Sequence, residues 1–296
     1  MSREASVLFD VPGPRARRRN LIVGVLGSLA LAGFLVFVIV RFDDTGQFES
    51  AKWDPFQYSG VQQFIFDGLK ATLKAFALAA VFSIVLGAFL AAGRLSDHRI
   101  VRWASTTFVT FFRAMPLLVL IFMLYLVPAS QGWWKWEPLW PLVVGLTIYN
   151  GTVQAENIRA GILAVPRGQS EAAYALGLRK TQVMTLILVP QGIRTMLPTI
   201  ISQIVVTLKD TSLGFLITYP ELLAAAKLIG GYQDYNMPFI PVTIIVGTIY
   251  IAMCMILSAL ATWLERRLRT SRKGKPPAAA TAGAGPAALP RDAMAV

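Results

Sequence analysis

The chain contains six apolar stretches, each about as long as the ~20 residues that an α-helix needs to cross the hydrocarbon core of a bilayer. The first covers residues 21–40 and carries no charge. The others cover about 69–93, 108–128, 138–159, 195–219 and 237–264. Backbone N–H and C=O groups in lipid must be paired internally, and helix formation achieves this within one segment. The sequence therefore predicts an all-α polytopic membrane protein with about six transmembrane helices.

Composition excludes several classes of protein. Hydrophobic residues make up 55% of the 296 residues and charged residues only 15%, which is unlike a soluble domain. Cys254 and His98 are the only residues of their kinds, so an internal disulfide and a His-based metal site are excluded, and a His-centred triad is disfavoured. The net charge of +12 lies beside the apolar spans. This placement indicates anionic membrane lipid rather than nucleic acid as the partner.

The basic residues predict the orientation of the chain. They gather before the first span, after the second, after the fourth and after the sixth: Arg15, Arg17, Arg18, Arg19; Arg94, Arg99, Arg102; Arg167, Arg179, Lys180; Arg266, Arg267, Arg269, Arg272, Lys273 and Lys275. The alternate loops carry few basic residues. Because Lys and Arg are enriched in cytoplasmic loops, we expect both termini to be cytoplasmic.

One cytoplasmic loop carries a distinctive polar segment, EAAYALGLRKTQVMTLILVP, over residues 171–190. Its alanines favour helix and are small enough for a partner surface to approach closely. Gly177 permits a sharp change of direction that ends one short helix and begins another. Ser170 is a candidate N-cap, with Glu171 in the first turn. The sequence therefore predicts a short helix lying parallel to the membrane on its cytoplasmic side.

This segment resembles the EAA motif of ABC importer permeases, through which a membrane subunit docks on its ATPase. Arg113-Ala-Met-Pro116 is similar to the Arg-Gly-Thr-Pro signature of polar amino-acid permeases, with Ala and Met in place of Gly and Thr. Four further matches are Tyr149, Glu156, Arg159, Gly161 and Ile162, similar to AYxxExxRxGI although Asn150 and Gly151 follow the Tyr here; Gly168-Gln169-Ser170; Pro190-Gln191 and Arg194 with Leu197-Pro198; and Lys209-Asp210-Thr211-Ser212-Leu213. The resemblance spans about residues 68–264. It is to the His/Glu/Gln-type permeases, and nearest to actinobacterial glutamate permeases.

The resemblance implies the transmembrane domain of a type I ABC importer that brings a polar amino acid, glutamate in the nearest relatives, across the bacterial cell membrane. Its partners would be an ATPase dimer, a second permease of the same or a related chain, an extracellular solute-binding protein and membrane lipid. The chain would not be an enzyme and would bind no cofactor or metal, because ATP and Mg are used by the ATPase. The chain itself has no GxxxxGK[ST] phosphate loop. The residues implied in ATPase coupling are Gly168, Gln169, Glu171, Ala172, Ala173 and Gly177.

The predicted organisation has five parts. Residues 1–20 form a basic cytoplasmic tail, and 21–40 form a retained first helix rather than a cleaved signal peptide. Residues 41–67 form an external loop. The permease core covers 68–265, with the EAA loop at about 165–195. Residues 266–296 form a basic and then Ala/Pro/Gly-rich tail that we expect to be disordered.

Lys209 and Asp210 interrupt the fifth span about fourteen residues from its start. At ~1.5 Å per residue they lie ~20 Å along the helix, where ionisable groups are costly and usually face a polar interior. As neighbours in a helix they point about 100° apart and need separate partners. Together with Thr211 and Ser212 they either line or gate a translocation path, or they lock helices together, and the sequence leaves both hypotheses open.

Four residues are predicted to support the structure or a gate. Glu156 and Arg159 have the i, i+3 spacing of a helical ion pair, which favours a local contact supporting the loop over contact with substrate. Arg113 lies at a cytoplasmic boundary, where a long basic side chain extends toward the headgroups. Pro116 is interpreted as an N-terminal kink rather than a gate.

An ion-gradient-driven secondary transporter is the alternative function. Such a protein would also have six or more helices with buried charges, and an inverted repeat would support it. No clear repeat relates the two halves of this chain, and an EAA-like loop has no role in such a transporter. A membrane enzyme is disfavoured because the first, second and sixth spans lack buried acids or histidines.

Overall fold

A computed structural model describes residues 13–133 and 135–270, and side chains within that range except those of 264–266 and 268–270. The described chain is helical and contains no strand. Its main elements are α1 (Pro14–Asp44), α2 (Ser59–Arg94), α3 (Arg99–Ala114), α4 (Leu117–Ser130), α5 (Leu139–Leu163), α6 (Arg167–Ala175), α7 (Lys180–Gln182), the π-helix η3 (Val183–Leu188), α8 (Val189–Asp210), the 3-10 helix η4 (Thr211–Ile217), α9 (Leu222–Gly230) and α10 (Phe239–Thr270). Short 3-10 turns are η1 (Ser50–Lys52), η2 (Asp54–Gln57) and η5 (Gln233–Tyr235). The predicted tails over 1–12 and 271–296 lie outside the described residues.

Helix α5 is the centre of the bundle and contacts α2, α3, α4 and α8. Glycines let two of these neighbours come close. A Cβ on Gly161 would lie 2.5 Å from the Gly192 carbonyl oxygen of α8, and a Cβ on Gly192 would lie 2.7 Å from the Ile162 nitrogen. A Cβ on Gly87 of α2 would lie 2.6 Å from the Gln154 Cβ. Small residues thus bring the backbones into direct contact, as in other helix pairs packed within membranes.

Four of the described helical segments are long and apolar enough to cross a membrane: Pro14–Asp44, Ser59–Arg94, Lys180–Ile217 and Phe239–Trp263. A fifth is obtained if α3 and α4, which bend by 98°, are counted as one span. The remaining predicted span is the fourth, over 138–159, and corresponds to α5, which is 25 residues long but less apolar than these segments. Its sequence includes Asn150, Gln154, Glu156 and Arg159, and α5 tolerates them because neighbouring helices surround it.

The third predicted span is not one straight helix. Helix α3 ends at Ala114, Met115 and Pro116 are extended with ψ values of 132° and 130°, and α4 begins at Leu117. A proline disfavours helical geometry at the residue before it, so the helix ends before Met115. Pro116 therefore separates two helices at a bend of 98°, which is more than the kink predicted from sequence.

The fifth predicted span also changes character along its length. Helix α8 ends at Asp210, and the chain continues as the 3-10 helix η4 up to Thr218, which has a positive φ of 64°. Lys209 and Asp210 therefore lie where the helix changes from α to 3-10 geometry, within one helical segment that covers Lys180–Ile217. The predicted end of this span near residue 219 is confirmed to within two residues, whereas the segment begins about fifteen residues before the predicted start.

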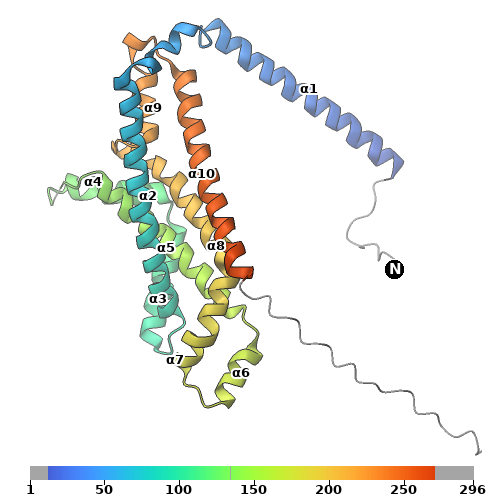
Figure 1. Cartoon of the computed structure of the whole chain (residues 1–296), viewed down its shortest axis with the longest axis vertical. Helices are drawn as coiled ribbons and strands as arrows, with labels where there is room; N and C mark the ends of the chain where they lie inside the picture. The colour runs from blue at the N-terminus through green and yellow to red at the C-terminus, as the bar shows by residue number, and fades with distance from the viewer. Residues whose placement is uncertain (1–12, 134, 271–296) are drawn as a thin grey trace, which may run out of the picture.

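The two predicted boundaries near the N-terminus also move. Helix α1 begins at Pro14 and takes in the basic residues assigned to the tail. Helix α2 begins at Ser59, ten residues before the predicted span, because Val61, Ile65 and Gly68 lie at helical spacing and form a buried face. The connection between α1 and α2 is correspondingly shorter than the predicted loop 41–67. No residue of α1 is buried, and α1 points away from the bundle (Figure 1).

Candidate functional site

Helix α6 forms a short projection at the end of the bundle opposite the connection between α1 and α2 (Figure 1). It begins directly after Pro166, whose extended ψ of 133° separates it from α5. Ser170 is not the N-cap, since it is the fourth residue of α6 and its exposed hydroxyl donates to the Arg167 carbonyl at 2.7 Å. The prediction that Glu171 occupies the first turn was likewise wrong. The helix starts four residues earlier than expected because Pro166 already breaks the preceding helix.

Gly177 ends α6 as the sequence predicted. It has a φ of +78°, in the left-handed region that favours glycine. Its N–H donates to the Tyr174 carbonyl at 2.9 Å, and the Leu178 N–H donates to the Ala173 carbonyl at 3.2 Å. This pair of bonds is the Schellman motif, which satisfies carbonyls left open at a helix end and turns the chain sharply. The chain then enters α7 and the π-helix η3.

The residues predicted for ATPase coupling lie together on this helix and its C-terminal turn. Gly168, Gln169, Glu171, Ala172 and Gly177 are exposed. Ala173 is only 2% exposed, and α6 contacts η3. Two apolar side chains that the sequence analysis did not select are exposed beside them, Tyr174 at 49% and Leu176 at 82%. The loop therefore has one face packed on its own subunit and another that presents apolar and small side chains outward.

A second loop at the same end of the bundle contacts the segment after α6. The Lys180 ammonium pairs with the Asp97 carboxylate and donates to the Leu95 carbonyl at 3.3 Å. The hydrogen bond between the Lys180 ammonium and the Asp97 carboxylate lowers the pKa of Asp97 below its usual range. No local sequence pattern indicates this pair, because the two residues are 83 positions apart.

We predict that the Asp97–Lys180 pair stabilises the protein near neutral pH and ceases to do so in acid. The pKa of Asp97 is lowered on folding, so its contribution is present above the unfolded pKa of about 3.9 and is lost as the pH falls through the folded value. Asp97→Asn should therefore give a slightly lower Tm than the parent chain near pH 7 and the same Tm in strong acid. Because the pair is exposed, the difference should also shrink in high salt. A Tm difference that persists unchanged in acid would contradict this assignment.

Glu156 on α5 is surrounded by three arginines from three helices. Arg159 donates to its Oε1 at 3.2 Å, Arg94 at the end of α2 pairs with its Oε2, and the Arg113 guanidinium lies 3.9 Å from the same oxygen. The side chains of Arg94 and Glu156 are 11% and 29% exposed. The i, i+3 pair was predicted, whereas Arg94 was missed and Arg113 was expected only to extend toward headgroups. One carboxylate thus joins the ends of α2 and α3 to α5.

The run Lys209 to Ser212 does not converge on one point. Lys209 is exposed and lines a cavity of about 550 Å³ with Tyr250, Ile251, Cys254, Met255 and Ser258 of α10. Asp210 is partly buried, and its carboxyl group interacts with the side-chain amide of Asn150 on α5. Thr211 is fully buried, whereas Ser212 is partly exposed and donates to the Lys209 carbonyl at 2.8 Å. Lys209 and Asp210 therefore have separate surroundings.

A fully buried carboxylate, Glu221, was missed by the sequence analysis. It caps α9 by accepting from the Leu223 and Ala224 N–H groups at 2.8 and 2.7 Å, and the Tyr250 hydroxyl of α10 donates to it at 2.7 Å. The Thr72 hydroxyl of α2 accepts a hydrogen bond from the Leu222 N–H, the first of α9, at 3.0 Å. An acidic residue before an apolar, alanine-rich run is favoured by the positive end of the helix dipole, and this pattern could have indicated where α9 begins. The partner hydroxyl on α10 could not have been read from local sequence.

Known proteins resemble this chain in sequence and in fold. The family model "Binding-protein-dependent transport system inner membrane component" matches residues 83–270. The chain is 38% identical over 240 residues to the glutamate transport system permease protein GluD of Corynebacterium glutamicum, covering 78% of this chain and 84% of that protein. It is 33% identical over 211 residues to the glutamate/aspartate import permease protein GltK of Escherichia coli, covering 69% and 93%.

A solved structure of an amino acid ABC transporter with histidines has a chain that is 30% identical to this one. The two superpose with a TM-score of 0.65, and the match covers 70% of this chain and 94% of the other. Because the family model covers more than half of the chain, the chain belongs to the family of binding-protein-dependent transport system inner membrane components.

Proposed function

We propose that this chain is the transmembrane subunit of an ATP-driven ABC importer that moves a polar amino acid, glutamate foremost, into the bacterial cytoplasm. The observation that carries the proposal is α6. It is a nine-residue helix, ended by Gly177 in a fixed turn, with one face packed on η3 and another exposed. A transporter driven by an ion gradient has no use for such a projection.

In this proposal the exposed face of α6 is the docking surface for an ATPase subunit. Leu176 and Tyr174 are the apolar side chains that a partner would bury, and Ala172 allows its surface to come close. Apolar anchors near the centre of an interface usually supply most of its binding free energy. Glu171 adds a charge that a basic residue of the partner can meet. The ATPase binds ATP and Mg, and this chain contributes the docking surface on α6.

Force from the ATPase would travel along one nearly continuous segment. Helix α6 contacts η3, and the helical run from Lys180 continues through α8 to Ile217, so it includes Lys209 and Asp210. Closure of the ATPase dimer would draw two such α6 helices together and rock the paired permeases from inward-facing to outward-facing. An extracellular binding protein would deliver the amino acid. Motion of this kind is a rigid-body change between two states.

The proposed orientation places α6 in the cytoplasm of a bacterial cell, with both termini on the same side. The basic residues after α2 and after α6 lie at the α6 end of the bundle, where the cytoplasmic excess of Lys and Arg is expected. This orientation would let α6 contact an ATPase subunit, since ATP is present on the cytoplasmic side of the membrane.

The choice of glutamate as the proposed substrate is supported by the similar permeases. GluD is a glutamate permease, and GltK is a glutamate/aspartate permease. Lys209 would suit a carboxylate in the path, but every amino acid has one, so Lys209 does not select glutamate.

We predict that Lys209→Met keeps the complex assembled and reduces uptake by about tenfold or more, a barrier increase of ~1.4 kcal/mol. The Lys209 side chain is exposed to an open cavity beside α10, so its replacement should leave the helix packing intact. It should remove the positive charge that a substrate carboxylate would meet there, and this would slow uptake. Uptake and size-exclusion profile should be compared with Lys227→Met, which removes an exposed lysine of α9 outside that cavity. Loss of the complex in Lys209→Met alone would instead support the hypothesis that Lys209 locks helices together.

The proposed function is tested by ATP-dependent uptake of labelled amino acids into proteoliposomes containing this chain, its ATPase and its binding protein. We expect glutamate uptake in the parent chain and its loss in Glu171→Lys, which reverses a charge on the docking face. The matched control is Glu49→Lys, which makes the same change on an exposed residue between α1 and α2, at the opposite end of the molecule. Uptake should survive in the control.

Two results would contradict the proposal. Gradient-driven uptake without any ATPase would make the secondary transporter the better description. Equal uptake by the Glu171→Lys and parent chains would leave ATPase docking without support from α6.

A further inference from the structure

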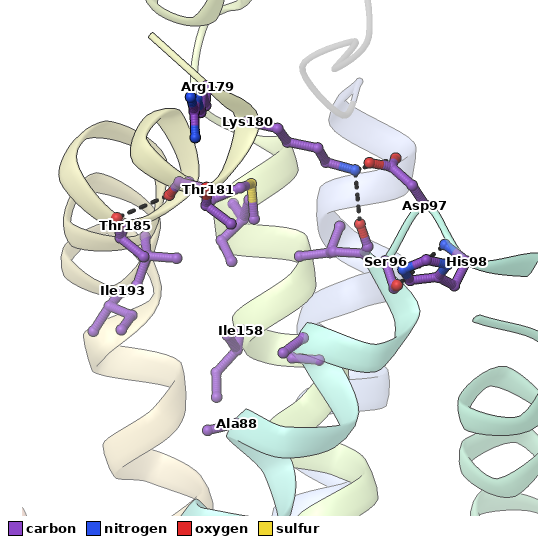
Figure 2. Close-up of a pocket in the computed structure, with 16 residues that line it drawn as sticks. Ala88, Ser96, Asp97, His98, Ile158, Arg179, Lys180, Thr181, Thr185 and Ile193 are labelled. Carbon is purple, nitrogen blue, oxygen red and sulfur yellow. Dashed lines mark hydrogen bonds and ion pairs between the residues drawn. The ribbon is translucent and has the colours of Figure 1, made fainter. Parts of the chain in front are cut away.

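A cavity of about 710 Å³ lies at the α6 end of the bundle, between the end of α2, the helix α5 and the segment from α7 to the start of α8 (Figure 2). Its walls are mainly apolar, and the three helical segments that form them include Ala88, Ala92, Ile158, Met184, Val189 and Ile193. The proposed function uses none of these side chains.

The mouth of this cavity is basic. Arg179 and Lys180 line it on one side, and the loop after α2 lines it on the other (Figure 2). Asp97 neutralises Lys180, but no carboxylate among the described residues forms an ion pair with Arg179. Arg102, in the first turn of α3, donates to the Ser96 carbonyl of this loop at 2.9 Å. The mouth and its margin thus carry the basic residues Arg179, Lys180 and Arg102 and the acidic residue Asp97.

Physical chemistry restricts what such a space can hold. A water molecule needs several polar partners, so a mainly apolar space of this size is a poor site for water. An empty space would forfeit the contacts that close packing provides. Hydrocarbon chains are the apolar material at hand, because α2 and α8 belong to segments apolar enough to cross a membrane. A basic mouth above an apolar space therefore fits a molecule with an anionic head and an acyl tail.

We propose that this cavity binds an anionic phospholipid of the inner leaflet, with its phosphate on Arg179 and an acyl chain between α2 and α8. The leaflet rests on the orientation given in the proposed function. Basic pockets between transmembrane helices on the cytoplasmic side are typical sites for anionic lipid headgroups. The acyl chain would fill the space between the bundle and η3.

The site would connect lipid binding to the segment that carries α6. The π-helix η3 forms part of the cavity wall through Met184 and Thr185, and it also contacts α6. Short π-helical segments are uncommon and occur often at functional sites. A bound acyl chain would support η3 against α2 and α5, so the position of α6 would depend on the lipid.

The test is native mass spectrometry of the full-length chain purified in detergent and titrated with phosphatidylglycerol or phosphatidylcholine of identical acyl chains. We expect phosphatidylglycerol to bind preferentially. Arg179→Gln should weaken its binding about fivefold, the factor expected from one basic side chain near an anionic headgroup. The control Arg167→Gln removes an exposed arginine of α6 outside the cavity and should bind as the parent chain does. Ala92→Phe, which fills the cavity and keeps its charges, should reduce binding of both lipids.

Three results would overturn the site. Equal binding of the two lipids by the parent chain would remove the role of the basic mouth. Equal loss in Arg179→Gln and Arg167→Gln would indicate diffuse attraction to a basic surface. Unchanged binding by a folded Ala92→Phe chain would show that the acyl chain lies elsewhere. If Ala92→Phe does not fold, the comparison of Arg179→Gln with Arg167→Gln decides whether the lipid binds at this cavity.

This experiment requires neither uptake nor an ATPase, so its failure is distinct from failure of the proposed function. Absent lipid binding with intact ATP-dependent uptake would reject only the lipid site. Specific lipid binding in a chain that transports without an ATPase would reject only the importer.

Discussion

Replacing Gly177 with tryptophan should abolish ATP-dependent uptake while the chain still inserts into the membrane. The φ of +78° at this position costs a residue with a side chain roughly 1–2 kcal/mol. The strain can be relieved only by opening the Schellman turn, which would change the direction of α6. No atom lies within 4 Å of a Cβ at Gly177, so the membrane-spanning helices need not move to accommodate the ring. We therefore expect loss of coupling rather than loss of folding.

The matched control for this variant is Gly132→Trp. Gly132 has a φ of +68°, and a Cβ placed on it would likewise have no atom within 4 Å, but it lies after α4, outside the α6 loop. Its replacement imposes the same backbone strain without touching α6. Uptake should be lost in Gly177→Trp and kept in Gly132→Trp at similar membrane yields. Unchanged uptake in Gly177→Trp would show that this turn does not position a docking helix.

Neutralising Glu156 should destabilise the protein by about 3 kcal/mol, the low end of the range for breaking a buried ion pair. Glu156→Gln keeps the shape of the side chain but leaves the guanidiniums of Arg94, Arg113 and Arg159 without their shared carboxylate. Arg94 is the costly one, since it is only 11% exposed and its Nε is buried with no hydrogen-bond partner. The expected loss of stability lies at the low end of that range because the Glu156 side chain is still 29% exposed.

The measurement is Tm in detergent, with Asp67→Asn as the control. Asp67 pairs with Lys70 at 3.0 Å, but both side chains are more than half exposed, so its loss should cost under about 1 kcal/mol. Adding Arg94→Met to Glu156→Gln should restore part of the lost stability by removing the buried charge. Equal Tm values for the Glu156→Gln and parent chains would show that the three helix ends are held by packing alone.

Local signals in the sequence were sufficient for several features. Apolar stretches of membrane-spanning length predicted helices, because backbone groups in lipid have no other way to be paired. Gly177 was identified as the end of α6, since the left-handed conformation at a helix end favours glycine over other residues. The Glu156–Arg159 contact followed from i, i+3 spacing on one helix.

Other local interpretations failed where a proline or a non-helical turn intervened. Ser170 has the chemistry of an N-cap, yet Pro166 starts α6 earlier. The apolar stretch 108–128 has the length of one span, yet its two parts are bent by 98° at Pro116. Apolar length alone does not determine where a helix changes direction.

The sequence by itself determined that the chain forms apolar helices, that a short helix follows α5 and that this helix ends at Gly177, because these properties depend on neighbours within a few residues. Only the tertiary structure decided which helices meet. It brought Arg94 to Glu156 across 62 positions and Tyr250 to Glu221 across 29, and it formed the cavity between α2 and α8. Such contacts depend on how whole helices pack against each other, as at Gly161 and Gly192, and no local pattern encodes that packing.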